Sequence, residues 1–186
     1  KEIKQAVLFS KRMGIKKMVL VGAKESWRLA DFLAENEVPV ILNRIHRLPM
    51  HKSDAIDIAF KTPKILLDAG VLFCLDYQGD MERMGSRNLP FTAGTTVAYG
   101  LTKEEALMSI TLNTAKVLGI AENLGSLEAG KEATLFVSDG DALDMLTNRV
   151  SLAFIRGKKL DLSNHQTQLY QKYKEKHKRE LNPHSN

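Results

Sequence analysis

The sequence predicts an α/β fold, and three observations lead to that class. Short runs of large apolar residues alternate along the chain with stretches in which apolar residues recur at helical spacing. These short runs are apolar throughout, which is typical of strands in a parallel sheet that is covered on both faces. Of the 186 residues, 44% are hydrophobic, which is enough apolar surface for a folded core and excludes wholesale disorder.

The first half of the chain is predicted to alternate between helix and strand. Residues 1–13 form the first predicted helix, which ends at Gly14, and the apolar run 17–21 forms the first strand. The second helix is expected over residues 25–35 and the second strand over residues 38–42. Parallel strands that follow one another are joined by right-handed crossovers, so each helix is expected to lie against the sheet.

A third helix and strand follow in the same order. The helix is expected over residues 55–68, with an interruption near Thr62 and Pro63, because a proline can begin a new helix. Residues 71–75 are again apolar throughout and predict a third buried strand.

The second half of the chain has a different pattern. Thr102 and Glu105 form a capping box, which predicts the start of a helix. The apolar stripe of this single predicted helix continues as far as Gly119, which ends it. Two further strands are expected over residues 133–138 and 151–156, paired antiparallel and separate from the parallel sheet.

The positive charge of the chain is concentrated at its C-terminal end. Residues 157–186 contain seven basic and three acidic residues, and so account for +4 of the net charge of +5. Nucleic-acid-binding domains usually carry their basic residues on the folded part instead. We therefore interpret this segment as a solvated helix that frays into a tail, and predict that the protein binds neither nucleic acid nor membrane. A nucleic-acid-binding or scaffolding protein that uses the basic tail is kept as an alternative.

Several classes of site and segment are excluded or left open by simple counts. The single cysteine, Cys74, cannot form an intramolecular disulfide or a cysteine-based zinc site. No apolar run approaches the roughly 18 residues of a membrane-spanning helix, and no signal-peptide pattern opens the chain. The chain begins at Lys1, inside a predicted helix, so we expect it to be a segment of a longer protein. The compartment is therefore left open between cytoplasm and periplasm.

Three segments in the second half resemble a known family. They are GLTKEEAL at 100–107, ITLNTAKVLG at 110–119 and LGSLEAGKEATLFV at 124–137. Together they resemble the C-terminal signature of the amidohydrolase superfamily, in its imidazolonepropionase-like branch. The resemblance is specific over residues 87–144, whereas residues 1–86 agree mainly in the order of their elements.

The resemblance implies the C-terminal portion of a TIM-type (β/α)8 barrel, followed by strands of a flanking small β-sandwich and a C-terminal helix. Residues 1–122 would form strands six to eight of the barrel with closing helices, residues 123–162 the sandwich strands, and residues 163–186 the basic helix and tail. Three barrel strands leave an open, apolar sheet edge. We therefore expect the segment to be inactive alone, and unstable or oligomeric unless it is joined to its N-terminal part.

The resemblance also places the site residues. Family members carry their catalytic groups at the carboxyl ends of the barrel strands. The sixth-strand position, where a His is usual, holds Gly22, and the eighth strand ends at Asp76, two residues before the usual place of the family's Asp. Asp76 is therefore the predicted catalytic carboxylate and metal ligand. His46, Arg87 and Asn88, in the loops after the seventh and eighth strands, are the predicted substrate-binding residues.

Two more side chains in these loops are candidates, Asp80 for the carboxylate role and His51 for substrate contact. A carboxylate beside a metal-bound hydroxide can accept its proton and pass it to a leaving nitrogen. This chemistry is the reason that a strand-end aspartate is expected in such a site.

The function implied by the resemblance is metal-dependent hydrolysis of C–N bonds in small cyclic amide, imide or dipeptide-like substrates. The cofactor is a divalent metal, expected to be zinc, which the full-length protein would bind because the site is incomplete in this segment. The expected partners are the small-molecule substrate, the missing N-terminal part of the barrel and a second copy in a homo-oligomer. The alternative is an amidohydrolase-fold protein that has lost the metal site and acts as a non-catalytic binding or scaffold protein.

Overall fold

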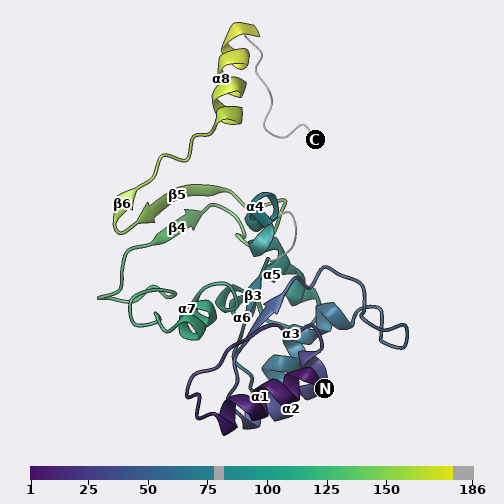
Figure 1. Ribbon diagram of the computed structural model, residues 1–186. Helices are drawn as coiled ribbons and strands as arrows, with labels where there is room; N and C mark the ends of the chain where they lie inside the picture. Colours follow the sequence, from purple (N-terminus) through teal and green to yellow (C-terminus); the bar gives the residue numbers. More distant parts are fainter. Residues whose placement is uncertain (78–81, 178–186) are drawn as a thin grey trace.

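Two separate sheets, joined by helices, organise the chain (Figure 1). The structure is a computed structural model that describes residues 1–77 and 82–177. The sheet in the first half is parallel and the sheet in the second half is antiparallel. Both the predicted α/β class and the separation of the two sheets are therefore confirmed.

The parallel sheet contains three strands in chain order, β1 (Leu20–Gly22), β2 (Val40–Asn43) and β3 (Phe73–Asp76). Each strand begins two or three residues later than the sequence predicts. Helices precede and connect the strands in the predicted order: α1 (Glu2–Arg12), the 3-10 helix η1 (Ser26–Leu29), α2 (Ala30–Glu35) and α3 (Ile58–Asp68).

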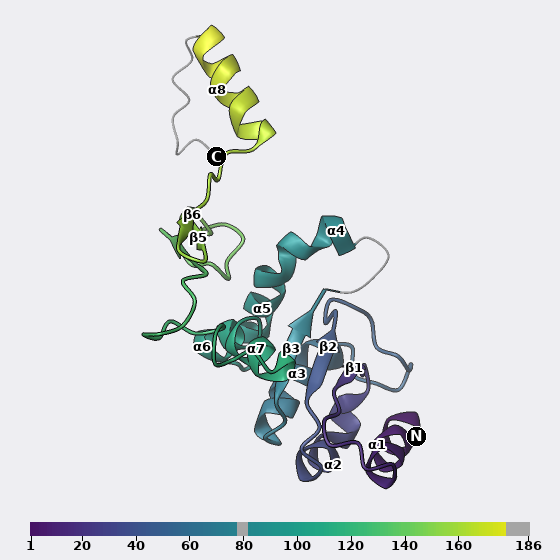
Figure 2. The ribbon, with the colours of Figure 1, turned by 60° about the vertical axis from the view of Figure 1, so that its left-hand side comes forward.

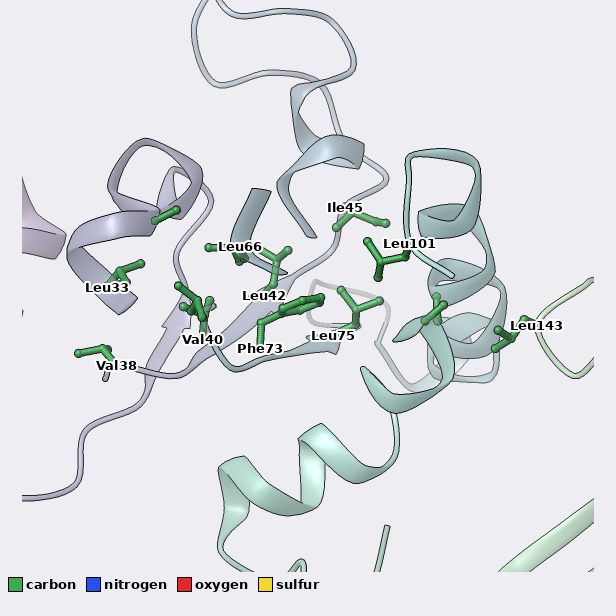
Figure 3. Packing of buried hydrophobic residues seen from close by; sticks show 14 of the residues in the cluster. Leu33, Val38, Val40, Leu42, Ile45, Leu66, Phe73, Leu75, Leu101 and Leu143 are labelled. Carbon is green, nitrogen blue, oxygen red and sulfur yellow. The ribbon is translucent and has the colours of Figure 1, made fainter. Parts of the chain in front are cut away.

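The main core lies between one face of this sheet and its helices (Figure 3). Val40 and Leu42 of β2, Phe73 and Leu75 of β3, and Leu66 of α3 are all buried in this cluster. Burial of apolar surface contributes roughly 25 cal/mol per Å², so this cluster is the main source of stability for the first half of the chain. The helices therefore cover one face of the parallel sheet, and a functional site would have to use the other face.

Helix α3 runs without a break through Pro63, so the predicted interruption near Thr62 and Pro63 is wrong. A proline has no N–H and cannot donate to the carbonyl oxygen four residues earlier, here that of Ala59. Thr62 and Pro63 are both buried, and the Thr62 hydroxyl donates to the Ile58 carbonyl oxygen at 2.8 Å. Packing in the core therefore offsets the missing backbone hydrogen bond.

The helix predicted from the capping box to Gly119 is divided in two, so that prediction is wrong in its length. The capping box itself is confirmed at the start of α6 (Lys103–Met108), and Gly119 ends α7 (Leu112–Leu118) with a positive φ of 73°.

The break between α6 and α7 serves a contact with the parallel sheet. The carbonyl oxygen of Ser109 accepts a hydrogen bond from the Leu75 N–H of β3 at 3.0 Å. A continuous helix would have used this carbonyl for its own ladder. The Leu75 N–H of β3 therefore donates to a carbonyl oxygen that would otherwise accept a hydrogen bond within the helix.

Helix α5 (Leu89–Ala98) lies where the sequence predicts no element, after the short helices α4 (Glu82–Gly85) and η2 (Ser86–Asn88). At Gly94 an added Cβ would lie 2.1 Å from the Leu143 carbonyl oxygen. The backbone of α5 and the loop before β5 therefore approach each other closely only because residue 94 has no side chain.

Replacing Gly94 with alanine is expected to destabilise the protein by about 1–3 kcal/mol, because the new methyl group overlaps backbone atoms. Helix propensity alone would favour alanine by about 1 kcal/mol, so the sign of the effect tests the contact. Urea unfolding measures it, with Ala98→Gly at the exposed end of α5 as the control for propensity, expected to cost no more than about 1 kcal/mol. A stabilised Gly94→Ala variant would contradict the close approach.

The antiparallel sheet contains β4 (Leu135–Ser138), β5 (Val150–Ile155) and β6 (Lys158–Lys159). A tight turn at Arg156 and Gly157, with φ values of 52° and 73°, joins β5 to β6. After a short extended segment, α8 (His165–His177) stands apart from both sheets (Figures 1 and 2). In the part of the chain that the structure describes, none of the helices has the length and apolar character needed to cross a membrane.

Candidate functional site

The carboxyl ends of the three parallel strands lie side by side and form the candidate site. The register pairs Asn43, the last residue of β2, with Asp76, the last residue of β3, and the preceding residue pair is Leu42 and Leu75. Leu42 and Leu75 are buried in the helix-side core, so the alternation of side chains along a strand directs Asn43 and Asp76 to the opposite face. Two polar side chains therefore lie together at one end of the face opposite the core, which is called here the open face although α7 covers it at β3.

The open face of the sheet carries Val21, Ile41 and Cys74 in one row. Val21 is 57% exposed, whereas Cys74 is buried. Burial raises the pKa of the Cys74 thiol, a hydrogen bond with Thr114 of α7 opposes this rise, and the charge of Asp76 adds to it. The electrostatic effect of Asp76 on Cys74 agrees with the placement of both side chains on the open face.

The end of β1 differs from the ends of the other two strands. Gly22 has a φ of +88°, and no heavy atom lies within 4 Å of the place that a Cβ would occupy. A side chain would therefore have room there, but L residues rarely adopt this backbone conformation. Ala23, the next residue, also has a positive φ, of 27°. The backbone at the end of β1 is thus built as a turn that disfavours the His usual at this position in the resembled family.

The described residues do not make up a complete metal site. Within residues 1–77 and 82–177, no group of three or more His, Cys, Asp and Glu side chains is arranged to hold a metal ion. At the open end of the sheet, Asp76 supplies one carboxylate and Asn43 one amide oxygen. Zinc sites in proteins use three or four nitrogen, sulfur or oxygen ligands, so further ligands would be needed.

His46 lies against the helices. Its Nε2 is 2.9 Å from Thr95 Oγ1 of α5, and its ring centre is 5.7 Å from that of Phe60 of α3. The Thr95 hydroxyl donates to the Phe91 carbonyl oxygen at 3.0 Å, so it accepts its other hydrogen bond from a protonated Nε2 of His46. The helix layer thus holds the imidazole, while Asp76 belongs to the open face.

His46 should make stability depend on pH. Burial and, second, the positive charge of Arg44 lower the pKa of His46 from its ordinary value of 6.5. The unfolded chain therefore binds a proton on His46 more tightly than the folded chain does. The contribution of neutral His46 to the free energy of unfolding is fully present above pH 6.5, and it is lost as the pH falls from 6.5 toward the lower pKa of the folded state.

The substitution His46→Gln is expected to reduce this loss of stability in acid, because glutamine does not titrate. Urea unfolding at about pH 5.5 and about pH 7.5 measures the change. His165→Gln, at the exposed start of α8, is the matched control and should leave the pH dependence as it is in the wild type. An unchanged slope in His46→Gln would show that other groups set the pH dependence.

The other predicted site residues follow β3 or lie in the loop after β2. Arg87 is exposed in η2, and the Asn88 carbonyl oxygen accepts a hydrogen bond from the Thr92 hydroxyl of α5 at 3.1 Å. The substrate-binding roles of Arg87 and Asn88 stay predictions. Asp80 lies outside the described residues.

The loop after β2 is fastened to the segment after β1 by ion pairs. His51 Nε2 is 3.0 Å from Glu25 Oε1, Arg28 Nε is 3.2 Å from the same oxygen, and Arg28 also pairs with Asp54. His51, a candidate for substrate contact, is therefore engaged in this network. Two of these pairs, His51–Glu25 and Arg28–Asp54, join residues 26 positions apart, which is why the sequence alone gives no signal for them.

A hollow of about 480 Å³ lies beside His46, between α5, the start of α6 and the loop before β5. Among its lining residues, Lys103 Nζ lies 2.6 Å from Asp141 Oδ2, and this hydrogen bond is the main cause that lowers the pKa of Asp141. The second oxygen of Asp141 accepts from the Leu143 N–H at 2.9 Å. The hollow thus presents a carboxylate that is already paired, and the open end of the parallel sheet remains the candidate site.

Comparison with known proteins gives a consistent set of relatives. A sequence model described as the amidohydrolase family matches residues 9–163. The imidazolonepropionase of Shewanella sp. (strain MR-4) is 44% identical over 64 residues, which are 34% of this chain and 15% of that protein. The imidazolonepropionase of Thermoplasma volcanium is 33% identical over 89 residues, which are 47% of this chain and 22% of that protein.

Solved structures extend the likeness over most of the chain. An amidohydrolase from Thermotoga maritima MSB8 matches with a TM-score of 0.70 and 27% identity, over 86% of this chain and 40% of that one. An adenosine deaminase from Xanthomonas campestris, solved with bound zinc, matches in fold with a TM-score of 0.57 and 19% identity, over 90% of this chain and 44% of that one. The chain therefore spans less than half the length of these structures, which agrees with a partial barrel.

Proposed function

The chain belongs to the amidohydrolase family, on its imidazolonepropionase-like branch, and from this premise we propose that it is part of a hydrolase that cleaves C–N bonds. The proposed substrates are small cyclic amides, imides or dipeptide-like compounds. The observation that carries the proposal is the position of Asp76, at the carboxyl end of β3 and on the open face of the sheet. Active sites of (β/α)8 barrels lie at this end of the strands.

We propose that further barrel strands cover the open face of the parallel sheet. The exposed Val21 at the edge strand β1 and the greater length of the solved relatives support this proposal. In the proposed division, residues 1–122 belong to the barrel, residues 123–162 to a flanking β-sandwich and residues 163–186 to a C-terminal helix and tail.

Asp76 has the central role in the proposed reaction. Its carboxylate would accept a proton from the attacking water and return it to the leaving nitrogen, as general base and then general acid. A divalent metal, zinc in this proposal, would supply an acidified water, with Asp76 as one ligand and the other ligands from outside the described residues. Arg87 and Asn88 would contact the substrate, and the exposed guanidinium of Arg87 is suited to a carboxylate group on it. His46, which is held in the helix layer by Thr95, is left out of this proposed contact.

Bound metal per chain, measured by elemental analysis of the longest natural protein that contains this sequence, tests the proposal. Near-stoichiometric zinc that falls in Asp76→Asn would support it, with Asp68→Asn at the exposed end of α3 as the control. Full metal in both proteins would remove Asp76 from the metal ligands, and no metal in either would contradict the hydrolase.

The second candidate is the alternative that the sequence left open, a protein with the family's fold that acts as a non-catalytic binding or scaffold protein. The backbone at Gly22 disfavours any side chain where the resembled family usually has a His ligand. The same metal measurement separates the two candidates, because the second one predicts a wild-type protein without bound zinc.

A further inference from the structure

Arg44 follows β2 directly, at the carboxyl end of the parallel sheet, and its backbone is fixed there. Its N–H donates to the Asp76 carbonyl oxygen at 3.2 Å, which continues the hydrogen bonding of β2 and β3 beyond the last pair, Asn43 and Asp76. Its φ is +22°, and residues with a side chain seldom adopt a positive φ. Such backbone strain in proteins is concentrated at functional sites. The backbone of Arg44 is therefore anchored beside the residue that the proposed function makes catalytic.

The side chain of Arg44 lies close to an aromatic ring. Its Cζ is 5.8 Å from the centre of the ring of Tyr77, the residue after Asp76, which is within the range of a cation–π contact. Arg44 also acts on His46, whose pKa is lowered by burial and, second, by the positive charge of Arg44. Both effects place the guanidinium near the ends of β2 and β3, where Arg44 is exposed to solvent.

The ring of Tyr77 is in turn fitted to helix α4, which lies beyond the carboxyl end of the sheet (Figure 2). At Gly85, the last residue of α4, an added Cβ would lie 2.0 Å from Tyr77 Cε1. Gly85 has a φ of −89°, which any residue can adopt, so its backbone conformation does not require glycine. The missing side chain instead makes room for the ring, and the ring then lies against the Arg44 guanidinium.

Arg44 differs from the two other arginines in the loops after β1 and β2. Arg28 is paired with two carboxylates, and Arg47 donates to two backbone carbonyl oxygens. With the residues that the structure describes, 1–77 and 82–177, Arg44 forms neither an ion pair nor a side-chain hydrogen bond. Its guanidinium donors are therefore left for a ligand as far as this part of the chain is concerned.

The chemistry of this group selects one class of ligand. A planar guanidinium forms two parallel, charge-assisted hydrogen bonds with a carboxylate, which fix both the position and the orientation of the bound group. The single charge of Arg44 also matches the single charge of a carboxylate, whereas a phosphate group carries nearly two charges. A small molecule with its reacting amide at Asp76 would present its own carboxylate to Arg44.

We propose that Arg44 binds a carboxylate group of the substrate, and that Tyr77 and Gly85 position its guanidinium for this contact. The inference rests on the proposed function, because it takes the reacting C–N bond to lie at Asp76. It narrows the substrates to small cyclic amides, imides or dipeptide-like compounds that carry a carboxylate. Arg87 is the competing residue for the same group, and substitution separates the two arginines.

Binding of paired probes to the longest natural protein that contains this sequence tests the contact. Pyroglutamic acid and hydantoinacetic acid each carry a carboxylate on a small cyclic amide, and their methyl esters carry none. Calorimetric titration of the wild type is expected to show that the acids bind roughly tenfold or more tightly than the esters, the usual strength of hydrogen bonds to a charged group. Arg44→Ala should abolish this preference by weakening the acids alone. For a probe that is hydrolysed, kcat/KM gives the same ratio.

Three further variants separate the contact from a structural role. Arg12→Ala is the matched control, because Arg12 is an exposed arginine whose Cζ lies 5.6 Å from the Phe9 ring on α1, and it should keep the full preference. Gly85→Ala leaves Arg44 in place but displaces the Tyr77 ring, so the preference should fall while the esters bind as before. Arg44→Lys keeps the charge without the planar fork and should retain only part of the preference. Circular dichroism checks that each variant is folded.

The preference for acids over esters distinguishes this inference from the proposed function. Hydrolysis without any preference for acids would overturn the role of Arg44 and leave the hydrolase standing. Tight binding of the acids without hydrolysis would contradict the hydrolase and keep the carboxylate contact. The role of Arg44 would also be overturned by an Arg44→Ala protein that retains the preference, or by a preference that is lost only in Arg87→Ala.

Discussion

Asp76→Asn is expected to lower kcat for C–N bond hydrolysis by about 10²- to 10⁴-fold, the usual effect of removing a general acid–base group. Asparagine keeps the shape of the side chain at the end of β3 but can neither accept the proton of a water nor carry charge toward a metal. The measurement is steady-state hydrolysis of a panel of small cyclic amides by the longest natural protein that contains this sequence. A fall in kcat with little change in KM is expected, because the carboxylate acts on the transition state.

The control for this prediction is Asp68→Asn, which removes a carboxylate from the surface end of α3. Asp68 pairs with Lys64 one turn earlier and is exposed, so its loss should leave kcat unchanged. An Asp76→Asn protein that retains full activity would mean that another group moves the proton, and Asp80 would be the next aspartate to replace.

Phe73→Ala is expected to lower the free energy of unfolding by about 3–5 kcal/mol, a large fraction of the stability of a domain this size. Phe73 is 1% exposed and lies in the centre of the core, among Val40, Leu42 and Leu66 (Figure 3). Truncation to alanine removes the apolar contacts and leaves a cavity that the packed residues of β2 and α3 cannot fill. Urea unfolding followed by circular dichroism measures the loss.

The matched control is Phe9→Ala on α1, the same chemical change at a side chain that is 52% exposed. It is expected to cost less than about 1 kcal/mol, because little apolar surface returns to water. Equal effects of the two substitutions would contradict the placement of the core between β3 and the helices.

The order of helices and strands could be predicted because apolar spacing is a local property of the sequence. The strand boundaries could not, because they depend on pairing. Residues 17–21 are apolar enough for a strand, yet β1 begins at Leu20, whose N–H donates to the Pro39 carbonyl oxygen before β2. The neighbouring strand, which the local pattern does not reveal, decides where the ladder starts.

The two main errors have a similar cause. The break between α6 and α7 is stabilised by a contact between Ser109 and β3, and α5 is fitted to its neighbour by a close approach at Gly94. Both contacts join segments distant in sequence, so tertiary packing overrides the local helical pattern. Thr62 and Pro63 are the same case, since burial keeps α3 continuous there.

For the site, the sequence could predict that Asp76 lies at the carboxyl end of a strand, because an apolar run followed by a carboxylate is a local feature. The catalytic role of Asp76 stays a prediction. Asn43 escaped notice, although it too follows an apolar run, because its pairing with Asp76 depends on the register of β2 and β3. The contacts of His46 with α5 could not be predicted either, since Thr95 lies 49 residues away.

The hydrogen bond from the Leu75 N–H to the Ser109 carbonyl oxygen determines at which edge of the parallel sheet further strands can pair. On the β3 side, an incoming strand would have to displace this hydrogen bond and move the junction between α6 and α7. The edge of β3 is therefore blocked. On the β1 side, Val21 is exposed and β1 has no strand beside it other than β2 in the part of the chain that the structure describes. Strands that complete the sheet should therefore add first beside β1, and ring closure at β3 should come last, as a separate and slower event in assembly.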